Sequence, residues 1–297
     1  MLPPKLQIGD TIGVIAPSGS FVRERLQPGL AYLHAQGYPV REGGGLYAQE
    51  RYLAGKDTDR AADVNAMFAD PDIRAIFVAR GGYGSARLLL HLDWDTLVEN
   101  PKILVGFSDT TALQLGLFAR IGLASFSGLA LCSDVTVQGI HPLTESSLWA
   151  AVCNHQFDPI DVMPLRAGNI QGVLIGGCLS LVTSLIGTPF SPRFDGAILF
   201  LEDVNEPLYR IDRLLTQLRL SGIMDRVAGV VFGQFYKCDP EREAEGTVQD
   251  ILDDFASQVL CPVYMGLPYG HGVGRRVMPI GLAGWIENGR LTFGTWS

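Results

Sequence analysis

The sequence predicts an α/β protein with two parts: an N-terminal parallel-sheet domain of the flavodoxin-like or Rossmann-like type, and a β-rich C-terminal domain. Strand-like and helix-like patterns alternate strictly in the first half, which is typical of a parallel sheet covered by helices on both faces. The stretch "IENGRLTF" near the end carries an Asn-Gly pair, which favours a two-residue turn between antiparallel strands. The chain has 297 residues, of which 47% are hydrophobic, enough for two cores.

The elements of the first half follow from the spacing of apolar residues and from the residues that end each run. Short β-rich runs bounded by Gly, Pro or Ser predict strands within 11–17, 38–42, 75–80, 103–107 and 123–128. Apolar residues at three- to four-residue spacing predict helices within 23–37, 57–70, 85–92 and 110–122. Ligands of such sheets bind beyond the carboxyl ends of the strands.

The second half mixes the two patterns less regularly. A helix is expected over 142–157, and the polar stretch 158–172 is interpreted as a loop that crosses between domains, which places the domains at 1–160 and 161–297. Strands are then expected at 172–177, 197–203 and 227–235, helices at 178–187, 209–224 and 247–259, and closing strands within 275–296.

Composition excludes several classes of function. The net charge is −8 and the 23 Lys and Arg residues are scattered, so neither nucleic acid nor an anionic membrane is expected as a partner. The five cysteines form no CxxC pair and have no histidine at ligand spacing, so no metal site, cofactor or disulfide framework is expected. Because the N-terminus carries no basic segment leading into a long apolar run, we expect a cytoplasmic protein.

The stretch "ILVGFSDTTALQ" places Ser108 between a predicted strand and a predicted helix. A serine at such a turn displays its hydroxyl, and the N–H of Asp109 at the helix N-terminus is suited to stabilise an oxyanion. Ser, Asp and Thr are also the preferred N-caps of helices, and Thr110 stands where the GxSxG nucleophile motif has glycine. From this stretch alone, a simple helix cap is the more common explanation.

Glycines 81, 82 and 84 in "FVARGGYGSARLLL" also follow a predicted strand and precede a predicted helix. Their backbone amides are suited to hold an anion, either a phosphate or the oxyanion of an acyl-transfer intermediate. As a dinucleotide motif the stretch is weak, because Arg87 replaces the last glycine of GxGxxG. A flexible turn without a ligand explains these glycines equally well.

Glu202 and His271 complete a possible nucleophile, base and acid set. Glu202 follows five apolar residues of a predicted strand, with Asp203 and Glu206 as competing acids, and His271 lies on a loop between glycines. A serine hydroxyl needs a base, which a neutral histidine supplies near neutral pH, and a carboxylate fixes the tautomer of that histidine. A single loop histidine is more often without a catalytic role, so the hypothesis requires the three side chains to converge.

Several motifs taken together resemble a known family. The stretches are "GGYGSARLL", "GFSDTTALQ", "SFSGLAL", "LIGGCLSLVTSLIGTPF", "LEDVNEPLYRIDRLLTQL" and "LPYGHG", spread from about residue 12 to residue 281. They resemble the LD-carboxypeptidases of murein recycling, a serine peptidase family that includes the microcin C immunity peptidases. The resemblance implies a two-domain protein, a homodimer in many members, and cleavage of the L,D-bond that releases D-alanine from murein tetrapeptides.

The same resemblance implies a Ser108–Glu202–His271 triad and an oxyanion hole formed by the backbone N–H groups of Asp109 and Gly82. A terminal carboxylate must also be recognised, for which a planar bidentate donor is suited. The candidates for substrate binding are Arg80, Tyr83 and Arg210, although both arginines could be surface ion-pair residues. Two alternatives stay open: an immunity peptidase acting on a peptidyl nucleotide, and a non-catalytic binder of a small anion.

Overall fold

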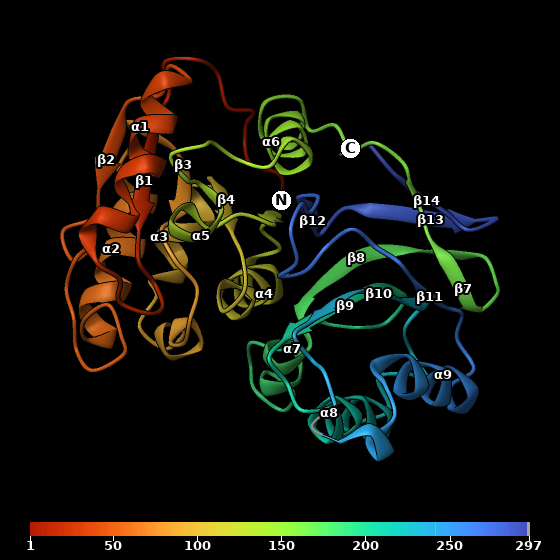
Figure 1. The fold of residues 1–297 in the computed structure, drawn as a ribbon. Helices are drawn as coiled ribbons and strands as arrows, with labels where there is room; N and C mark the ends of the chain where they lie inside the picture. The colour runs from red at the N-terminus through yellow and green to blue at the C-terminus, as the bar shows by residue number, and fades with distance from the viewer. Residues whose placement is uncertain (241, 296–297) are drawn as a thin grey trace.

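The computed structural model describes residues 1–240 and 242–295 and contains two β-sheets (Figure 1). The first sheet has the strand order β12-β5-β4-β3-β1-β2. Its strands are β1 (Thr11–Ile15), β2 (Val40–Glu42), β3 (Ile73–Val78), β4 (Ile103–Gly106), β5 (Ser125–Ser127) and β12 (Met278–Ile280). All pairs are parallel except β12 with β5. The predicted N-terminal parallel sheet is confirmed, and its order 2-1-3-4-5 is the flavodoxin-like one.

Helices connect these strands and cover the sheet. They are η1 (Arg23–Arg25), α1 (Gln27–Ala35), α2 (Asp57–Ala69), η2 (Ser85–Leu88), α3 (Trp94–Glu99), α4 (Thr110–Ile121), α5 (Leu131–Asp134) and α6 (Pro142–Trp149), the last continued by a π-helical turn over Ala150–Asn154. Helix α4 ends at Gly122, whose φ of 66° is the left-handed conformation that favours glycine. The helix expected over 85–92 is only a short 3₁₀ turn, and α3 and α5 were not predicted.

The second sheet is mixed, as expected for a β-rich C-terminal part, with the order β6-β14-β13-β8-β9-β10-β11-β7. The strands are β6 (Ile160–Asp161), β7 (Met163–Arg166), β8 (Ile170–Cys178), β9 (Ala197–Val204), β10 (Gly229–Tyr236), β11 (Val263–Met265), β13 (Ala283–Glu287) and β14 (Arg290–Phe293). Helices α7 (Leu179–Ser184), α8 (Leu208–Leu220) and α9 (Val248–Gln258) lie on one side of it, and η4 (Glu243–Glu245) precedes α9 (Figure 1).

The C-terminal hairpin is confirmed, because Asn288 and Gly289 have φ values of 51° and 74° between the antiparallel strands β13 and β14.

The loop interpretation of 158–172 is wrong, because this stretch contains β6, β7 and the start of β8. Strands β6 and β7 are short edge strands and β7 is mostly exposed, which leaves no alternating pattern to detect. The last residues of the predicted closing strands, from 296 onward, lie outside the described residues.

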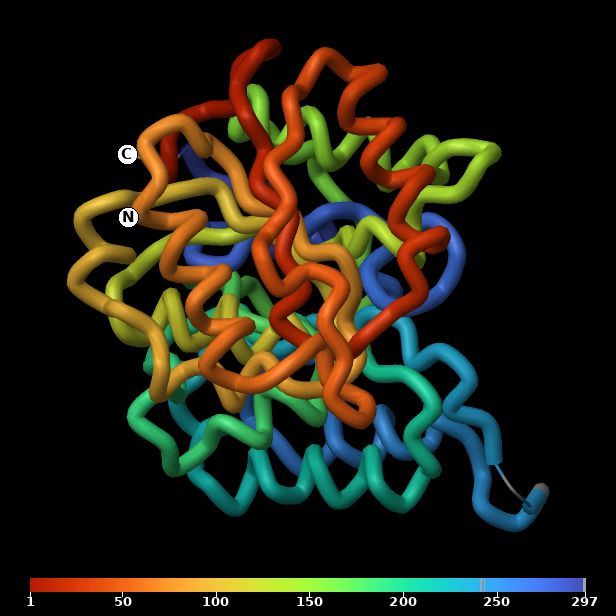
Figure 2. Tube along the Cα trace, turned by 90° about the vertical axis from the view of Figure 1, so that its left-hand side faces the viewer, coloured from red at the N-terminus to blue at the C-terminus, as the bar shows by residue number. Residues whose placement is uncertain are grey.

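The two sheets meet along α4 and β12. Helix α4 packs against β8 and α7, and β12 contacts β8 while pairing with β5. One hydrophobic cluster contains buried side chains of both halves, among them Leu113 of α4 and Leu174 of β8. Figure 2 shows the N-terminal half lying over the C-terminal helices. The predicted boundary at residue 160 stays a prediction, since β12 belongs to the first sheet.

Within the described parts of the chain, no helix combines the length and apolar character needed to span a bilayer.

Candidate active site

Ser108 lies at the carboxyl end of β4, in a strained turn just before α4. Its φ of 64° is unusual for a residue with a side chain and is typical of a serine displayed for reaction. No side chain caps the N-terminus of α4, and the Ser108 hydroxyl instead contacts His271. The cap explanation for Ser108 therefore does not apply.

The glycine loop after β3 fits closely around this turn. A Cβ atom on Gly81 would lie 2.8 Å from the Cβ of Ser108, so a side chain at position 81 would displace the serine. The next glycine, Gly82, has a φ of 110°, again a conformation that favours glycine. The backbone at position 81 thus lies against Ser108 because it carries no side chain, whereas a Cβ on Gly82 would face Gly19, with its Cα 3.3 Å away.

His271 belongs to the loop between β11 and β12, and β10 fixes that loop in place. Gln234 donates its backbone N–H to the carbonyl of Tyr269 at 2.8 Å, and its side-chain Oε1 accepts the N–H of Gly272 at 3.0 Å. A Cβ on Gly233 would lie 2.2 Å from the Tyr269 carbonyl oxygen, so only glycine allows this approach. Gln234 thus forms hydrogen bonds with residues before and after His271, and these bonds fix the loop that carries the histidine ring.

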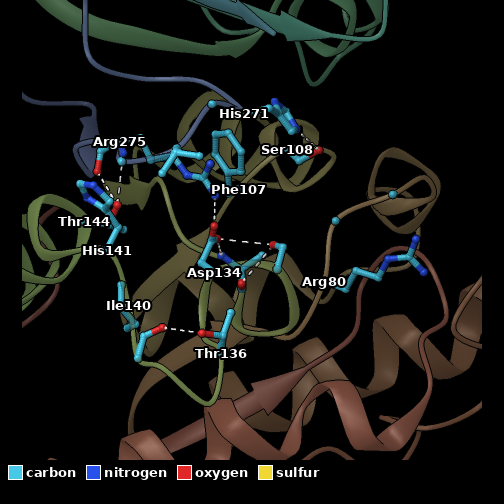
Figure 3. Close-up of a pocket in the computed structure, with 18 residues that line it drawn as sticks. Arg80, Phe107, Ser108, Asp134, Thr136, Ile140, His141, Thr144, His271 and Arg275 are labelled. Atoms are coloured by element: carbon cyan, nitrogen blue, oxygen red, sulfur yellow. Dashed lines mark hydrogen bonds and ion pairs between the residues drawn. The ribbon is translucent and has the colours of Figure 1, made fainter. Parts of the chain in front are cut away.

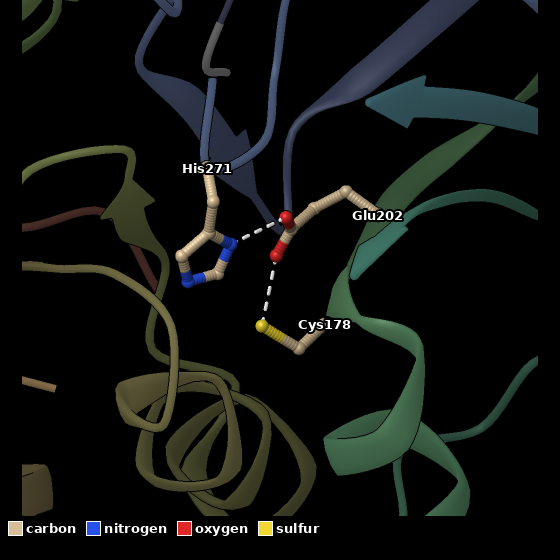
Figure 4. A group of neighbouring side chains, drawn as sticks. All are labelled: Cys178, Glu202 and His271. Atoms are coloured by element: carbon tan, nitrogen blue, oxygen red, sulfur yellow. Dashed lines mark hydrogen bonds and ion pairs between the residues drawn. The ribbon is translucent and has the colours of Figure 1, made fainter. Parts of the chain in front are cut away.

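Glu202 lies inside β9 and is fully buried, and strand register sets its surroundings. Cys178 is its direct partner on the parallel neighbour β8. The Cys178 thiol donates to Glu202 Oε1 over 2.8 Å, and Glu202 Oε2 lies 2.7 Å from His271 Nδ1 (Figure 4). On the other side of the ring, Nε2 lies 3.0 Å from Ser108 Oγ. The structure therefore brings Ser108, His271 and Glu202 into one hydrogen-bonded line, at distances suited to proton transfer.

The same trio of Cys178, Glu202 and His271 is a possible metal-binding group, since its ligand atoms lie within 4.8 Å of one another. Burial, and next the negative charge of Glu202, hold the pKa of the Cys178 thiol well above its usual range. The protonated thiol is thus the donor in the hydrogen bond to Glu202. In this structure the Glu202 carboxylate accepts from the thiol and contacts His271, whose other ring nitrogen contacts Ser108.

The backbone amides expected to form the oxyanion hole are those of Gly82 and Asp109. Neither N–H donates a hydrogen bond within the part of the chain that the structure describes. The buried Asp109 carboxylate joins the loops that carry them: its Oδ2 accepts the Ser18 hydroxyl at 2.6 Å and the Ser85 N–H at 2.8 Å. This carboxylate fixes the position of the Ser108 turn relative to the glycine loop, and both amides stay available to a ligand.

A cavity of about 530 Å³ opens at this point (Figure 3). Besides Ser108, His271 and the glycines, Phe107 lines it, with its ring centroid 4.6 Å from that of His271 and 3.9 Å from the Arg275 guanidinium. Arg275 is buried and donates to the carbonyls of Gly128 and Gly270 and to the carboxylate of Asp134. Its charge is therefore neutralised by a protein carboxylate, and its role is to tie the His271 loop to the first domain.

The three candidate substrate-binding residues differ in position. Arg80 lines the cavity, but its guanidinium donates to the carbonyl of Ser20 and extends away from Ser108 and His271 (Figure 3). Tyr83 packs edge to face on Tyr52 and does not line the cavity. Arg210 lies outside it too, and its Nε is 2.7 Å from Glu206. The geometry gives no support to Tyr83 or Arg210 as substrate ligands.

Comparison with known proteins identifies the family of this chain. Residues 12–128 match the model of the LD-carboxypeptidase N-terminal domain, and residues 171–285 match that of the LD-carboxypeptidase C-terminal domain. The chain belongs to the LD-carboxypeptidase family. Its arrangement of one mostly parallel and one mixed sheet matches the fold of a solved relative, the microcin C7 self-immunity protein MccF.

Individual LD-carboxypeptidases align over nearly the whole chain. A probable murein peptide carboxypeptidase of Bacillus subtilis is 36% identical, with 94% of this chain and 89% of that protein covered. A murein tetrapeptide carboxypeptidase of Pseudomonas aeruginosa is 33% identical, with 96% and 95% covered. The wild-type apo structure of the microcin C7 self-immunity protein MccF superposes with a TM-score of 0.90 at 26% identity, covering 100% of this chain and 99% of MccF.

Sequence reasoning missed Cys178 and Arg275. Cys178 ends an apolar strand, and only the register of β8 against β9 shows that it faces a carboxylate. Arg275 stands beside Arg276 in the sequence, and no pattern distinguishes the buried arginine from its more exposed neighbour. The contacts of both residues depend on strands and loops that are distant in the chain, so they leave no local pattern in the sequence.

Replacing Cys178 with alanine is expected to lower kcat/KM roughly 2- to 10-fold, the usual effect of losing one hydrogen bond, because Glu202 Oε1 loses its donor in a buried site. Cys178→Ser restores a donor and should restore most of kcat/KM. An equal loss of kcat/KM in both variants would show that Cys178 acts only through packing.

Proposed function

We propose that the protein is a serine carboxypeptidase that hydrolyses the L,D-peptide bond of murein tetrapeptides and releases the terminal D-alanine. The observation that carries the proposal is the line of hydrogen bonds from Ser108 Oγ through His271 to Glu202, at 3.0 and 2.7 Å. Membership of the LD-carboxypeptidase family and the murein-peptide relatives at 33–36% identity support this substrate class. The resemblance also leads us to propose a homodimer in the cytoplasm.

The reaction follows from the positions of the polar atoms. His271 Nε2 takes the proton of Ser108 Oγ as that oxygen bonds to the scissile carbonyl carbon, and the carbonyl electron pair moves onto the oxygen. The N–H groups of Gly82 and Asp109 stabilise this oxyanion. When the tetrahedral intermediate collapses, the carbon–nitrogen bond breaks and His271 gives its proton to the departing D-alanine. Water, deprotonated by the same imidazole, then hydrolyses the acyl-enzyme and frees Ser108.

The Glu202 carboxylate orients the base throughout this cycle. It accepts the Nδ1 proton of His271, which leaves Nε2 free to accept the Ser108 proton, and its negative charge stabilises the imidazolium that forms. Since Cys178 donates to the other carboxylate oxygen, both oxygens of Glu202 are fixed. The base therefore holds one orientation before substrate binds, which lowers the cost of reorganisation in the transition state.

A second candidate is an immunity-type peptidase that cleaves a peptidyl nucleotide, favoured by the close superposition on MccF. A nucleobase needs an aromatic platform, and of the described side chains around the cavity only Phe107 is a large aromatic hydrocarbon ring. Trp94 stacks on Phe190 and Trp149 on Tyr38, both away from the cavity. The lining therefore favours a murein peptide.

A peptide panel tests the proposal. Cleavage is measured by mass spectrometry, as the truncated product of each substrate, for murein tetrapeptides that end in D-alanine or in L-alanine and for a peptidyl nucleotide. We expect release from the D-terminated peptide, with the L-terminated peptide and the nucleotide cleaved at least about 100-fold more slowly. Preferential cleavage of the nucleotide would favour the immunity function. Absence of both hydrolysis and labelling by a fluorophosphonate would favour the non-catalytic binder.

A further inference from the structure

A second pocket, of about 520 Å³, adjoins the active-site cavity and shares Arg80 and Ser133 with it. Its lining is formed by Ser20, Phe21, Val22, Arg25, Gln49, Arg80, Cys132 and Ser133. These residues follow the carboxyl ends of β1, β2, β3 and β5, the edge at which parallel sheets bind ligands. A molecule held at Ser108 and extended past Arg80 therefore enters this pocket.

Two guanidinium groups give the second pocket a positive charge. Neither Arg25 nor Arg80 forms an ion pair within the described residues. Both lie close enough to Cys132 to oppose, by their charge, the effect of burial that raises the pKa of its thiol to about 12. In a chain of net charge −8, this pocket is lined by two arginines and by no acidic residue, which concentrates positive charge there.

The neighbouring arginine on the same 3₁₀ turn shows the contrast. Arg23 lies 4.0 Å from the Glu42 carboxylate, and its guanidinium lies 4.2 Å from the centre of the Tyr47 ring. The Arg23 guanidinium therefore already has an acidic and an aromatic partner within the protein, and Arg23 does not line the second pocket. Arg23 and Arg25 are therefore a matched pair for mutation: both lie on the same turn, but only Arg25 lines the second pocket.

We propose that the second pocket binds a free carboxylate on the acyl part of the substrate, the part that stays on Ser108 when the leaving group departs. This inference rests on the proposed function. A carboxylate suits the site because arginine side chains bind it in a planar, bidentate manner. The leaving D-alanine is excluded as its source, because its carboxylate is one carbon from the scissile nitrogen, whereas neither Ser108 nor His271 lines this pocket.

Two carboxylates of a murein tetrapeptide meet this requirement. One is the free α-carboxylate of the second residue, a glutamate linked through its side chain, and the other is the side-chain carboxylate of a diaminopimelate at the third position. Both lie on the acyl side of the bond to be cut. Four peptides separate them: the parent tetrapeptide with diaminopimelate, an analogue with a carboxamide at the second residue, an analogue with lysine at the third, and an analogue with a terminal carboxamide.

The experiment measures binding of the four peptides by calorimetry to the full chain carrying Ser108→Ala, which binds without turning over. The same peptides are then tested with Arg25→Ala and with Arg23→Ala added, and Arg80→Gln serves as a second variant of the pocket. We expect Arg25→Ala to weaken binding of the parent about 10-fold or more, and Arg23→Ala to leave it unchanged. The effect of Arg25→Ala should disappear for one acyl-side analogue, which identifies the carboxylate that is bound.

Three results would overturn the inference. They are an unchanged affinity in both Arg25→Ala and Arg80→Gln, an equal loss for all four peptides, and a loss that disappears only for the terminal carboxamide. Release of D-alanine by the wild-type chain is assayed in parallel. If release occurs and the arginine variants bind normally, the second pocket is wrong and the proposed function stands. If no peptide binds or is cleaved, both are wrong.

Discussion

Replacing Ser108 with alanine is expected to lower kcat for D-alanine release by at least about 10³-fold, and to abolish labelling by a fluorophosphonate. The change removes the hydroxyl oxygen that lies 3.0 Å from His271 Nε2, so no acyl-enzyme can form. The amides of Gly82 and Asp109 remain and account for any residual rate. Release is followed by a coupled D-amino-acid oxidase assay, and folding by the melting temperature.

Thr110→Val is the matched control for this change. The Thr110 hydroxyl lies two residues from Ser108 in the same turn, is buried, and has no hydrogen-bond partner among the described residues. Because this hydroxyl has no hydrogen-bond partner among the described residues, replacing it with a methyl group removes no hydrogen bond, and the variant should retain near wild-type activity. If Ser108→Ala also retained activity, with a normal melting temperature, then Ser108 would not be the nucleophile.

The positions of Ser108 and His271 could be predicted because their signals are local. Ser108 follows a buried strand and precedes a helix, and this order alone places it at the carboxyl edge of the sheet. His271 stands among glycines on a loop, where no helix or strand pattern accounts for it. The pattern around Ser108 does not distinguish a helix cap from a nucleophile, since both begin with a serine at that turn. The positive φ and the contact to His271 argue against the cap and support the proposed nucleophile.

Other parts of the molecule depend on tertiary structure and left no such signal. The sequence indicates that Glu202 ends an apolar run, but its complete burial and its contact with Cys178 come from the pairing of β8 with β9. The edge strands β6 and β7 were predicted as loop because strands this short and exposed show no periodicity. The difference between Arg23, which lies 4.0 Å from Glu42, and Arg25, which has no ion pair among the described residues, likewise depends on the tertiary structure.

Replacing Glu202 with glutamine is expected to lower kcat by about 10⁴-fold while KM changes little, because the effect falls on the tautomer of the base. A carboxylate offers two acceptors, one to the Cys178 thiol and one to His271 Nδ1. Glutamine offers one acceptor and one donor of the same shape. Its oxygen can therefore serve only one of these partners.

If the amide nitrogen faces His271, Nδ1 becomes the acceptor and the ring proton moves to Nε2, where it points at Ser108 and blocks proton abstraction. If the oxygen faces His271, the ring keeps its tautomer. The amide nitrogen then faces the Cys178 thiol, so two hydrogen-bond donors meet in a fully buried site. In addition, no negative charge remains to stabilise the imidazolium. Either arrangement slows acylation, and both predict slower labelling of Ser108 by a fluorophosphonate.

Glu206→Gln provides the comparison, because Glu206 lies four residues further along, pairs with Arg210 and does not contact His271. Its kcat should stay within about 3-fold of wild type, since a partly exposed ion pair contributes little. The two variants remove the same charge from the same segment, so a difference of about 10³-fold or more between them isolates the contact with the base. A kcat for Glu202→Gln within 10-fold of wild type would mean that His271 works without its buried carboxylate, and the relay would have to be abandoned.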